Sequence, residues 1–312
     1  MEILQGKDIE IISECREINT ELFNRFISYL DVSAKTVETY SKSLRQLSNY
    51  FVREGIISPT RENIIAYKEY LASSGHKATT IQNYIAAAKI FFRWAKQEGL
   101  YENIADHIKS MKLDRGHKKD YLTSEQLKEI LAKINREDER GKRDYAILTL
   151  MATCGLRDIE ISRADIKDLG SVGENTVLYI QGKGKQEKSE YVKISPVVEK
   201  ILREYLIVRA KIKDSDPLFI STSNNSKGLR LSTRSVSGIV KTRFKNAGYN
   251  TERLTAHSLR HTAVTLALLA GKNITEVQQF ARHANITTTM IYNHSLDCAK
   301  NSCSEAITQM IF

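Results

Sequence analysis

Apolar residues recur every three or four positions in four stretches of the first hundred residues, which predicts four amphipathic helices. The stretches cover 19–31, 33–55, 63–75 and 79–99, and the last three end at a glycine, which often terminates a helix. Because their connections are short, the helices favour a small bundle. Residues 111–120 follow, mostly polar and without an apolar period, and they predict an interdomain linker.

Beyond residue 120 the chain mixes helical periods with two strand-like runs. Thr123 opens a capping-box pattern, and a second helix, from about Lys142, ends at Gly155. Runs 175–181 and 190–194 are rich in Val, Ile and Tyr and predict two strands of one hairpin with a basic tip. Further helices are predicted at three places, from Ser195, from Ser232 to Ala247 and from His257.

These elements predict a mainly α fold with a small antiparallel β-sheet. At 312 residues the chain is longer than a usual single domain, so two domains are expected. We place a helical domain at 1–110, the linker at 111–120 and an α+β domain at 121–312. The C-terminal segment has weak helical periodicity, which fits either packing on its own domain or docking into a neighbouring subunit.

Composition adds charge to this picture. With 47 Lys+Arg against 37 Asp+Glu the formal net charge is +10, which fits nucleic acid binding or a merely basic surface. The four cysteines have no CxxC spacing, which argues against a disulfide framework or a zinc site and fits a reducing cytosol. The N-terminus is acidic, and the apolar run 263–270 is too short to cross a bilayer. We therefore expect a cytoplasmic protein without a membrane partner.

The polar faces of the predicted bundle carry cations beside short hydroxyl side chains. Lysines on helices are most often simply solvated, but threonine and serine next to lysine at a helix start also suit contacts with DNA phosphates. On that second interpretation the DNA-binding residues are Lys35, Thr36, Lys42, Arg45, Lys77, Thr79, Lys89 and Arg93.

The segment from His257 to Tyr292 gathers histidines and arginines beside one tyrosine. His257 and Arg260 lie one turn apart near a helix start, where backbone donors, the helix dipole and the side chains all favour an anion. Tyr292 is either a packing residue, the commoner case, or a nucleophile. A nucleophilic tyrosine needs help, because its ordinary pKa of about 10 leaves it neutral at pH 7. Cations such as Arg260 and His283 would lower that pKa.

Two groups outside this segment carry further candidate chemistry. Arg157 and Glu160 share one face of a predicted short helix, where Glu160 can orient the guanidinium, although such pairs are usually surface contacts. Lys183 lies on the hairpin tip, where most lysines are solvated. No P-loop, dinucleotide-binding, HExxH or GxSxG pattern occurs, nor an acidic cluster for magnesium. A tyrosine with arginines, histidines and a lysine indicates metal-free phosphodiester transfer through a covalent phosphotyrosine.

Four motifs resemble the successive signatures of the tyrosine recombinases, the phage integrase and Xer family. They are GLRDIEI at 155–161, GKGK at 182–185, HSLRH at 257–261 and ARHANITTTMIYNH at 281–294. The helical bundle before them resembles the core-binding domain of that family. The resemblance therefore covers residues 19–295, nearly the whole chain.

The resemblance implies a role for each matching residue. Four side chains would form a cationic cradle around the scissile phosphate: Arg157, His257, Arg260 and His283. Lys183 would be the general acid that protonates the leaving 5′-hydroxyl, and Tyr292 the nucleophile that forms a 3′-phosphotyrosine link. Glu160 and His261 would support the site from behind. No metal and no cofactor are implied, because the phosphotyrosine bond conserves the energy of the phosphodiester.

The resemblance also implies partners. The two domains would form a C-shaped clamp on duplex DNA, four protomers would assemble in a synapse, and neighbours would exchange the C-terminal segment. An accessory directionality factor would fit this picture. Two departures stand out: Arg282 replaces the usual small residue before His283, and Lys185 is a rival to Lys183. The chain resembles the compact members, which lack an N-terminal arm-binding domain.

Within that resemblance the function has several versions. We favour the integrase of a mobile element over a resolvase of chromosome or plasmid dimers. A DNA-binding relative that has lost catalysis is less expected, because all six catalytic positions are intact. A type IB topoisomerase shares the chemistry but would relax supercoils without a specific site.

Overall fold

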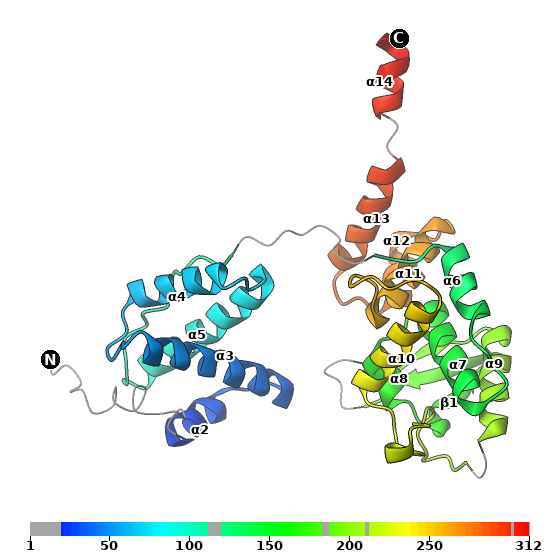
Figure 1. Cartoon of the computed structure of the whole chain (residues 1–312), viewed down its shortest axis with the longest axis horizontal. Coiled ribbons are helices and arrows are strands. Elements are labelled where there is room, and N and C mark those ends of the chain that lie inside the picture. The colour runs from blue at the N-terminus through cyan, green and yellow to red at the C-terminus, as the bar shows by residue number, and fades with distance from the viewer. Residues whose placement is uncertain (1–19, 112–119, 183–186, 210–211, 301–302, 312) are drawn as a thin grey trace. The chain divides into compact units, whose positions relative to one another are not determined.

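The computed structural model describes residues 20–111, 120–182, 187–209, 212–300 and 303–311 (Figure 1). The chain divides into two compact units, Met1–Arg115 and Gly116–Phe312, each with its own hydrophobic core. Most of the expected linker lies outside the described residues, as do Lys183 and Lys185 of the expected hairpin tip. No described helix combines the length and the apolar character needed to span a bilayer.

The first unit contains four described helices, α2 (Thr20–Tyr29), α3 (Ala34–Arg53), α4 (Arg61–Ser73) and α5 (Ala78–Gln97). This confirms the four helices expected from the apolar periods. α3 begins after Ser33 because its hydroxyl accepts a hydrogen bond from the backbone of Thr36. α4 begins two residues before the predicted start, where Thr60 and Asn63 form a capping box. The core is aromatic, and the ring of Phe26 packs between those of Phe91 and Trp94.

The second unit is also mainly helical (Figure 1). Its α-helices are α6 (Ser124–Ala132), α7 (Glu139–Cys154), α8 (Asp158–Arg163), α9 (Pro196–Val208), α10 (Thr233–Asn246), α11 (Ala256–Leu269), α12 (Ile274–Ala281), α13 (Ile286–Lys300) and α14 (Cys303–Ile311), with short 3-10 turns η1 (Ile166–Asp168) and η2 (Asn224–Ser226). The central helix is α7, against which α6, α9 and α11 pack. α7 starts before the predicted Lys142, because Asp138 caps it by accepting from the backbone of Gly141.

A three-stranded antiparallel sheet lies beside these helices in the order β1 (Leu169–Val172), β2 (Asn175–Ile180) and β3 (Glu190–Lys193). Its register pairs Leu178 of β2 with Leu169 on one side and with Val192 on the other. The predicted hairpin is β2–β3. β1 was not among the strand candidates, because its short run Leu-Gly-Ser-Val lacks the usual strand composition.

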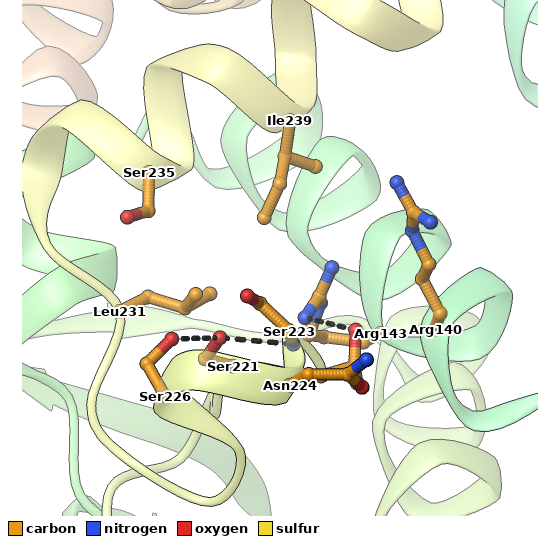
Figure 2. Close-up of a pocket in the computed structure, with 10 residues that line it drawn as sticks. Arg140, Arg143, Ser221, Ser223, Asn224, Ser226, Leu231, Ser235 and Ile239 are labelled. Carbon is orange, nitrogen blue, oxygen red and sulfur yellow. Dashed lines mark hydrogen bonds between the residues drawn. The ribbon is translucent and has the colours of Figure 1, made fainter.

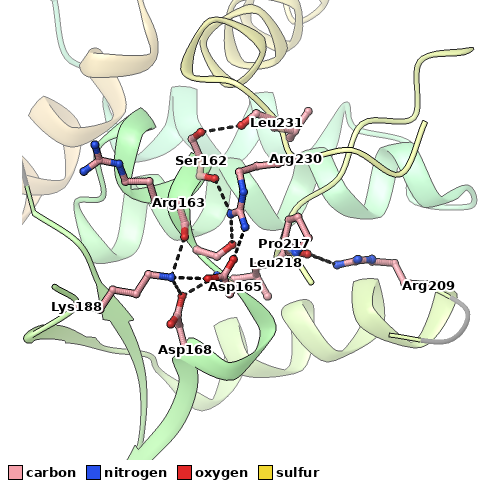
Figure 3. Close-up of polar contacts among 11 residues, drawn as sticks. Ser162, Arg163, Asp165, Asp168, Lys188, Arg209, Pro217, Leu218, Arg230 and Leu231 are labelled. Carbon is pink, nitrogen blue, oxygen red and sulfur yellow. Dashed lines mark hydrogen bonds and ion pairs between the residues drawn. The ribbon is translucent and has the colours of Figure 1, made fainter. Parts of the chain in front are cut away.

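The sequence places Lys188 on the basic tip of the predicted hairpin, but its side chain is not free. Its ammonium group donates to the carboxylates of Asp165 and Asp168 and to the backbone carbonyl of Arg163 (Figure 3). Arg230 completes the cluster by pairing with the other oxygen of Asp165. The two carboxylates are mostly buried, so they need these cations. Lys188 therefore ties the chain just before β3 to the turn that follows α8.

Candidate active site

The turn between α7 and α8 carries the first cluster of candidate residues. Gly155 ends α7 at a φ of 59°, a conformation that a side chain disfavours, and a Cβ there would lie 3.4 Å from the ring of Phe280. Arg157 then caps α8. Glu160 accepts from the backbone and the guanidinium of Arg157, both at 2.8 Å, and its side chain is fully buried. The predicted orienting role of Glu160 toward Arg157 fits this geometry.

α11 places three more candidates within its first two turns. Arg260 is 1% exposed and donates to the carbonyl oxygens of Gly155, at 2.5 Å, and of Ala281. Burial, and then the nearby Arg157 and Arg282, lower the pKa of Arg260 to about 9. His257 is exposed, and its ring packs edge to face against that of the buried His261, with 4.5 Å between the ring centroids. The cations that the sequence placed at this helix start thus adjoin the α7–α8 turn.

Tyr292 of α13 is 5% exposed, and its hydroxyl forms a hydrogen bond with Nδ1 of His261. Burial raises the pKa of Tyr292 to about 12, although the nearby Arg260 acts in the opposite direction. The expected effect of a cation on this pKa is present at Arg260, but the loss of solvent outweighs it, so the net shift is upward. Deprotonation of Tyr292 therefore needs an acceptor, and His261 is in contact with it.

His283 lies on the other side of the tyrosine. Its ring stacks on that of Tyr292 with 6.2 Å between centroids, and its Nδ1 is 2.9 Å from Oγ1 of the fully buried Thr289. Burial is the main reason that the pKa of His283 falls to about 4, and Arg260 is the next. The imidazole is therefore neutral at pH 7. Thr289 was not predicted, because its only signal in the sequence is its place in a threonine run between His283 and Tyr292.

Arg282 contacts the same group of residues. It lies 10% exposed at the end of α12 and donates to Glu160 at 2.9 Å and to the carbonyl oxygen of Gly155 at 3.1 Å. The sequence marked Arg282 only as a departure from a pattern. Its contact with Glu160 joins residues 122 positions apart, which no local pattern reveals.

The structure thus brings together most of the predicted site, within the second unit. The contacts above connect Arg157, Glu160, His257, Arg260, His261, His283 and Tyr292. Lys183 lies outside the described residues. The arrangement gives one buried phenol, a histidine in contact with its hydroxyl, and the guanidinium of Arg260 nearby, a set that suits a nucleophile next to a bound anion.

The residues predicted to contact DNA lie in the first unit, on α3, on α5 and, for Lys77, at the N-cap of α5. Lys35 and Lys42 are exposed but both pair with Glu38, at 2.5 and 2.6 Å. Their hydrogen bonds lower the pKa of Glu38 to about 2. Part of the positive charge expected on α3 is therefore balanced by this carboxylate. Arg45 and Arg93 are exposed, and Lys89 is half-buried.

A separate pocket of about 570 Å³ lies at the start of α7, facing α10 and the loop around η2 (Figure 2). Its lining is rich in serine, with Ser221 and Ser226 hydrogen-bonded to each other at 2.8 Å. Arg143 reaches the pocket but is bound to Asp144 and to the carbonyl of Ile220. None of the described catalytic candidates lines this pocket.

Comparison with known proteins identifies the family. The sequence matches the phage integrase family over residues 120–298 and the phage integrase N-terminal SAM-like domain over residues 22–99. This chain belongs to the phage integrase family. Tyrosine recombinase XerA of Pyrococcus horikoshii is 31% identical over 276 residues, 88% of this chain and 89% of the relative. A tyrosine recombinase of Synechococcus elongatus is 30% identical over 249 residues, 80% and 77% of the two chains. The protein is therefore a tyrosine recombinase.

Solved structures share the fold of this tyrosine recombinase. The XerH recombinase in its post-cleavage complex with difH has a TM-score of 0.71 at 23% identity, covering 98% of this chain and 92% of XerH. The integrase of transposon Tn1549, bound to transposon right end DNA, has a TM-score of 0.68 at 20% identity, covering 87% and 93%. The predicted fold class, mainly α with a small antiparallel sheet, is confirmed.

Proposed function

We propose that this tyrosine recombinase is site-specific, cuts and rejoins duplex DNA through a 3′-phosphotyrosine intermediate, and serves the integration and excision of a mobile element. One observation carries the chemistry: the buried hydroxyl of Tyr292 contacts His261 next to the arginine cluster. A tyrosine that only packs needs a hydrogen-bond partner for its hydroxyl but not a neighbouring guanidinium, which Arg260 supplies here. DNA as the substrate is supported by the family and by the net charge of +10.

In the proposed cleavage step, the Tyr292 oxygen attacks the scissile phosphorus and the bond from phosphorus to the 5′-oxygen breaks. The phenolic proton passes to His261, which is already in contact with the hydroxyl. Lys183 gives its proton to the leaving 5′-oxygen. Arg157 and Arg260 stabilise the charge that builds on the non-bridging oxygens, aided by His257 and His283.

Rejoining is the reverse of this step. The 5′-hydroxyl of a partner strand gives its proton to Lys183 and attacks the phosphotyrosine, and Tyr292 leaves with a proton returned by His261. The number of phosphodiester bonds is unchanged, so the reaction needs no energy cofactor. Strand exchange needs several active sites at once, and we propose that four protomers assemble on DNA and exchange the C-terminal segment.

The exposed end of the chain supports such an exchange. On α14, Ile307, Met310 and Ile311 are 55%, 88% and 67% exposed, so an apolar face is available to a second copy of the chain. Cross-linking of the DNA-bound protein would test this assembly. A tetramer that disappears on substitution of Met310 by Asp would support it, and an unchanged tetramer would exclude α14 from the interface.

A second candidate function is the resolution of chromosome or plasmid dimers. It is favoured by the Xer names of the relatives, among them XerC of Thermodesulfovibrio yellowstonii at 26% identity. The two functions share the chemistry and differ in the target. An integrase acts at the ends of its own element, whereas a resolvase acts at one site on each circular molecule.

Covalent capture from a DNA library tests the proposal without knowledge of the site. The protein is incubated with nicked duplexes of randomised sequence, in which the short cleaved fragment diffuses away and traps the intermediate. DNA that remains bound after denaturation is sequenced. We expect one common sequence, joined through its 3′-phosphate; its position in a genome separates integrase from resolvase. Binding without any covalent product would refute the enzymatic proposal, and adducts without a common sequence would favour a topoisomerase.

A further inference from the structure

Arg282 has a backbone conformation that is costly for its residue type. Its φ is 54°, and among the described residues only one other non-glycine, His107, has a positive φ. A side chain in this left-handed region crowds its own backbone, so glycine or asparagine is the usual residue at such a helix end. The arginine side chain must therefore make contacts that offset this cost.

The guanidinium of Arg282 donates hydrogen bonds to Glu160 and Gly155, which lie far from it in sequence, and to the nearby Phe280. One terminal nitrogen, Nη2, donates to Oε2 of Glu160 at 2.9 Å and to the carbonyl of Gly155 at 3.1 Å. The other, Nη1, donates to the carbonyl of Phe280 at 3.0 Å. Arg282 thus ties the end of α12 to the turn and helix that carry Arg157.

The carboxylate of Glu160 is held from both sides. Its Oε1 accepts from Nη1 of Arg157 at 2.8 Å, while its Oε2 accepts from the Arg157 backbone at 2.8 Å and from Arg282. With both oxygens fixed, the carboxylate cannot rotate away from the Arg157 guanidinium. Arg282 therefore restricts the position of Arg157, although it does not contact Arg157 by a hydrogen bond.

Arg282 also bears on His283 and Arg260. The neighbouring His283 follows directly in the chain, and Arg260 donates to Gly155 and to Ala281, the same two segments that Arg282 joins. Two guanidinium groups, those of Arg157 and Arg282, contact the carboxylate of Glu160, and the charge of Arg260 acts on the same largely buried group, so positive charge is in excess around this carboxylate. Nε of Arg282 is buried and has no hydrogen-bond partner in the described structure. The excess fits a site that is completed by an anion.

We propose that Arg282 is a positioning residue of the recombinase active site: by gripping Glu160 and Gly155 it fixes the Arg157 side chain for the scissile phosphate. The inference rests on the proposed function and adds a residue to it. Because Arg282 acts through Glu160, its loss should slow the chemical step and leave DNA binding intact. A displacement of about 1 Å in a catalytic group costs on the order of 100-fold in rate. We therefore expect the loss of Arg282 to lower the cleavage rate roughly 10- to 100-fold.

The test uses the full-length protein and a nicked duplex recovered by covalent capture. Single-turnover cleavage is measured against protein concentration, which separates the rate at saturation from the concentration that gives half of it. Glycine tolerates the positive φ at position 282, so the backbone of Arg282→Gly is not strained. We expect the saturating rate to fall roughly 10- to 100-fold with an unchanged half-saturation, and Arg282→Lys to recover part of it, because one ammonium group replaces the planar fork.

A matched control exists elsewhere in the same unit. Asp144 is also held by two arginines, Arg143 at 2.6 Å and Arg243 at 2.6 Å. It lies eleven residues before Gly155 on α7, or about 16 Å along the helix. Arg243→Lys breaks the same kind of grip and should lower stability without changing the saturating cleavage rate. A rate lost equally in both variants would indicate general destabilisation and overturn the proposal.

Dependence on Glu160 gives the second criterion. If Arg282 acts through Glu160, Arg282→Gly slows cleavage less than about threefold in a Glu160→Gln background, since the shared interaction is already lost. Additive effects would overturn the proposal, as would a wild-type rate for Arg282→Gly. Should that variant fail to fold by circular dichroism, the same cycle with Arg282→Lys decides. The wild-type protein is the reference: if it forms no adduct, the proposed function fails, whereas a wild-type adduct with no effect of Arg282 refutes only this inference.

Discussion

Replacement of His261 by alanine tests how the buried tyrosine loses its proton. With a pKa of about 12, Tyr292 is ionised at pH 7 in about one molecule in 100,000. Forming the phenolate in advance would therefore cost about 7 kcal/mol. A positioned general base avoids this by taking the proton during the attack, and it typically contributes about 100- to 10,000-fold in rate. His261→Ala should lower the cleavage rate at pH 7 by that factor.

The pH dependence sharpens this prediction. Without an acceptor the variant relies on phenolate already present, whose fraction rises about tenfold for each pH unit below the pKa of Tyr292. Single-turnover cleavage by His261→Ala should therefore accelerate about tenfold per unit between pH 7 and 9. Thr265→Ala, one turn further along α11 and also buried, controls for damage to the helix. A cleavage rate of His261→Ala equal to that of the wild type, or one that does not rise with pH, would refute the role of His261.

Three further predictions concern the frame around the site. Burial lowers the pKa of His283 from its ordinary value to about 4 in the folded protein. Its neutral form therefore stabilises the fold fully above about pH 6.5, the ordinary pKa in the unfolded chain, and this contribution is lost as the pH falls toward 4. Urea unfolding at pH 7 and 5 should show a larger loss for wild type than for His283→Gln. Lys188→Met leaves two mostly buried carboxylates without their lysine and should cost about 2 kcal/mol in urea unfolding, whereas Lys167→Met, on the exposed side of η1, should change little. Gly155 and Gly173 both have a positive φ, so substitution of either by alanine costs about 1 kcal/mol. Only the Cβ at position 155 would also lie 3.4 Å from the ring of Phe280, so Gly155→Ala should lower the urea midpoint of unfolding more than Gly173→Ala. Equal effects would contradict the close contact.

Local patterns were sufficient for much of the fold. The helices of the first unit follow from apolar periods of three to four residues, and their starts follow from capping residues such as Ser33 and Thr60. The pair of Arg157 and Glu160 was also accessible, because residues three apart on one helix face each other. β1 was not, since a four-residue run with a glycine acquires its strand conformation only by pairing with β2.

The site itself depends on contacts that sequence spacing does not encode. Arg282 meets Glu160 across 122 residues, and Tyr292 meets His261 across 31. The net rise in the pKa of Tyr292 could not be predicted, because a list of nearby cations says nothing about burial, and burial is the larger effect here. The motifs identified the residues, and the tertiary structure decides their ionisation and partners.

Identification of the amino acid joined to DNA is the most direct test of the central claim. The captured adduct is digested with protease and nuclease, and the peptide that keeps a nucleotide is sequenced by mass spectrometry. The proposed chemistry predicts a 3′-phosphate on Tyr292 and a free 5′-hydroxyl on the released fragment, with no adduct from Tyr292→Phe. A phosphopeptide at any other residue, or an adduct that persists in Tyr292→Phe, would contradict it.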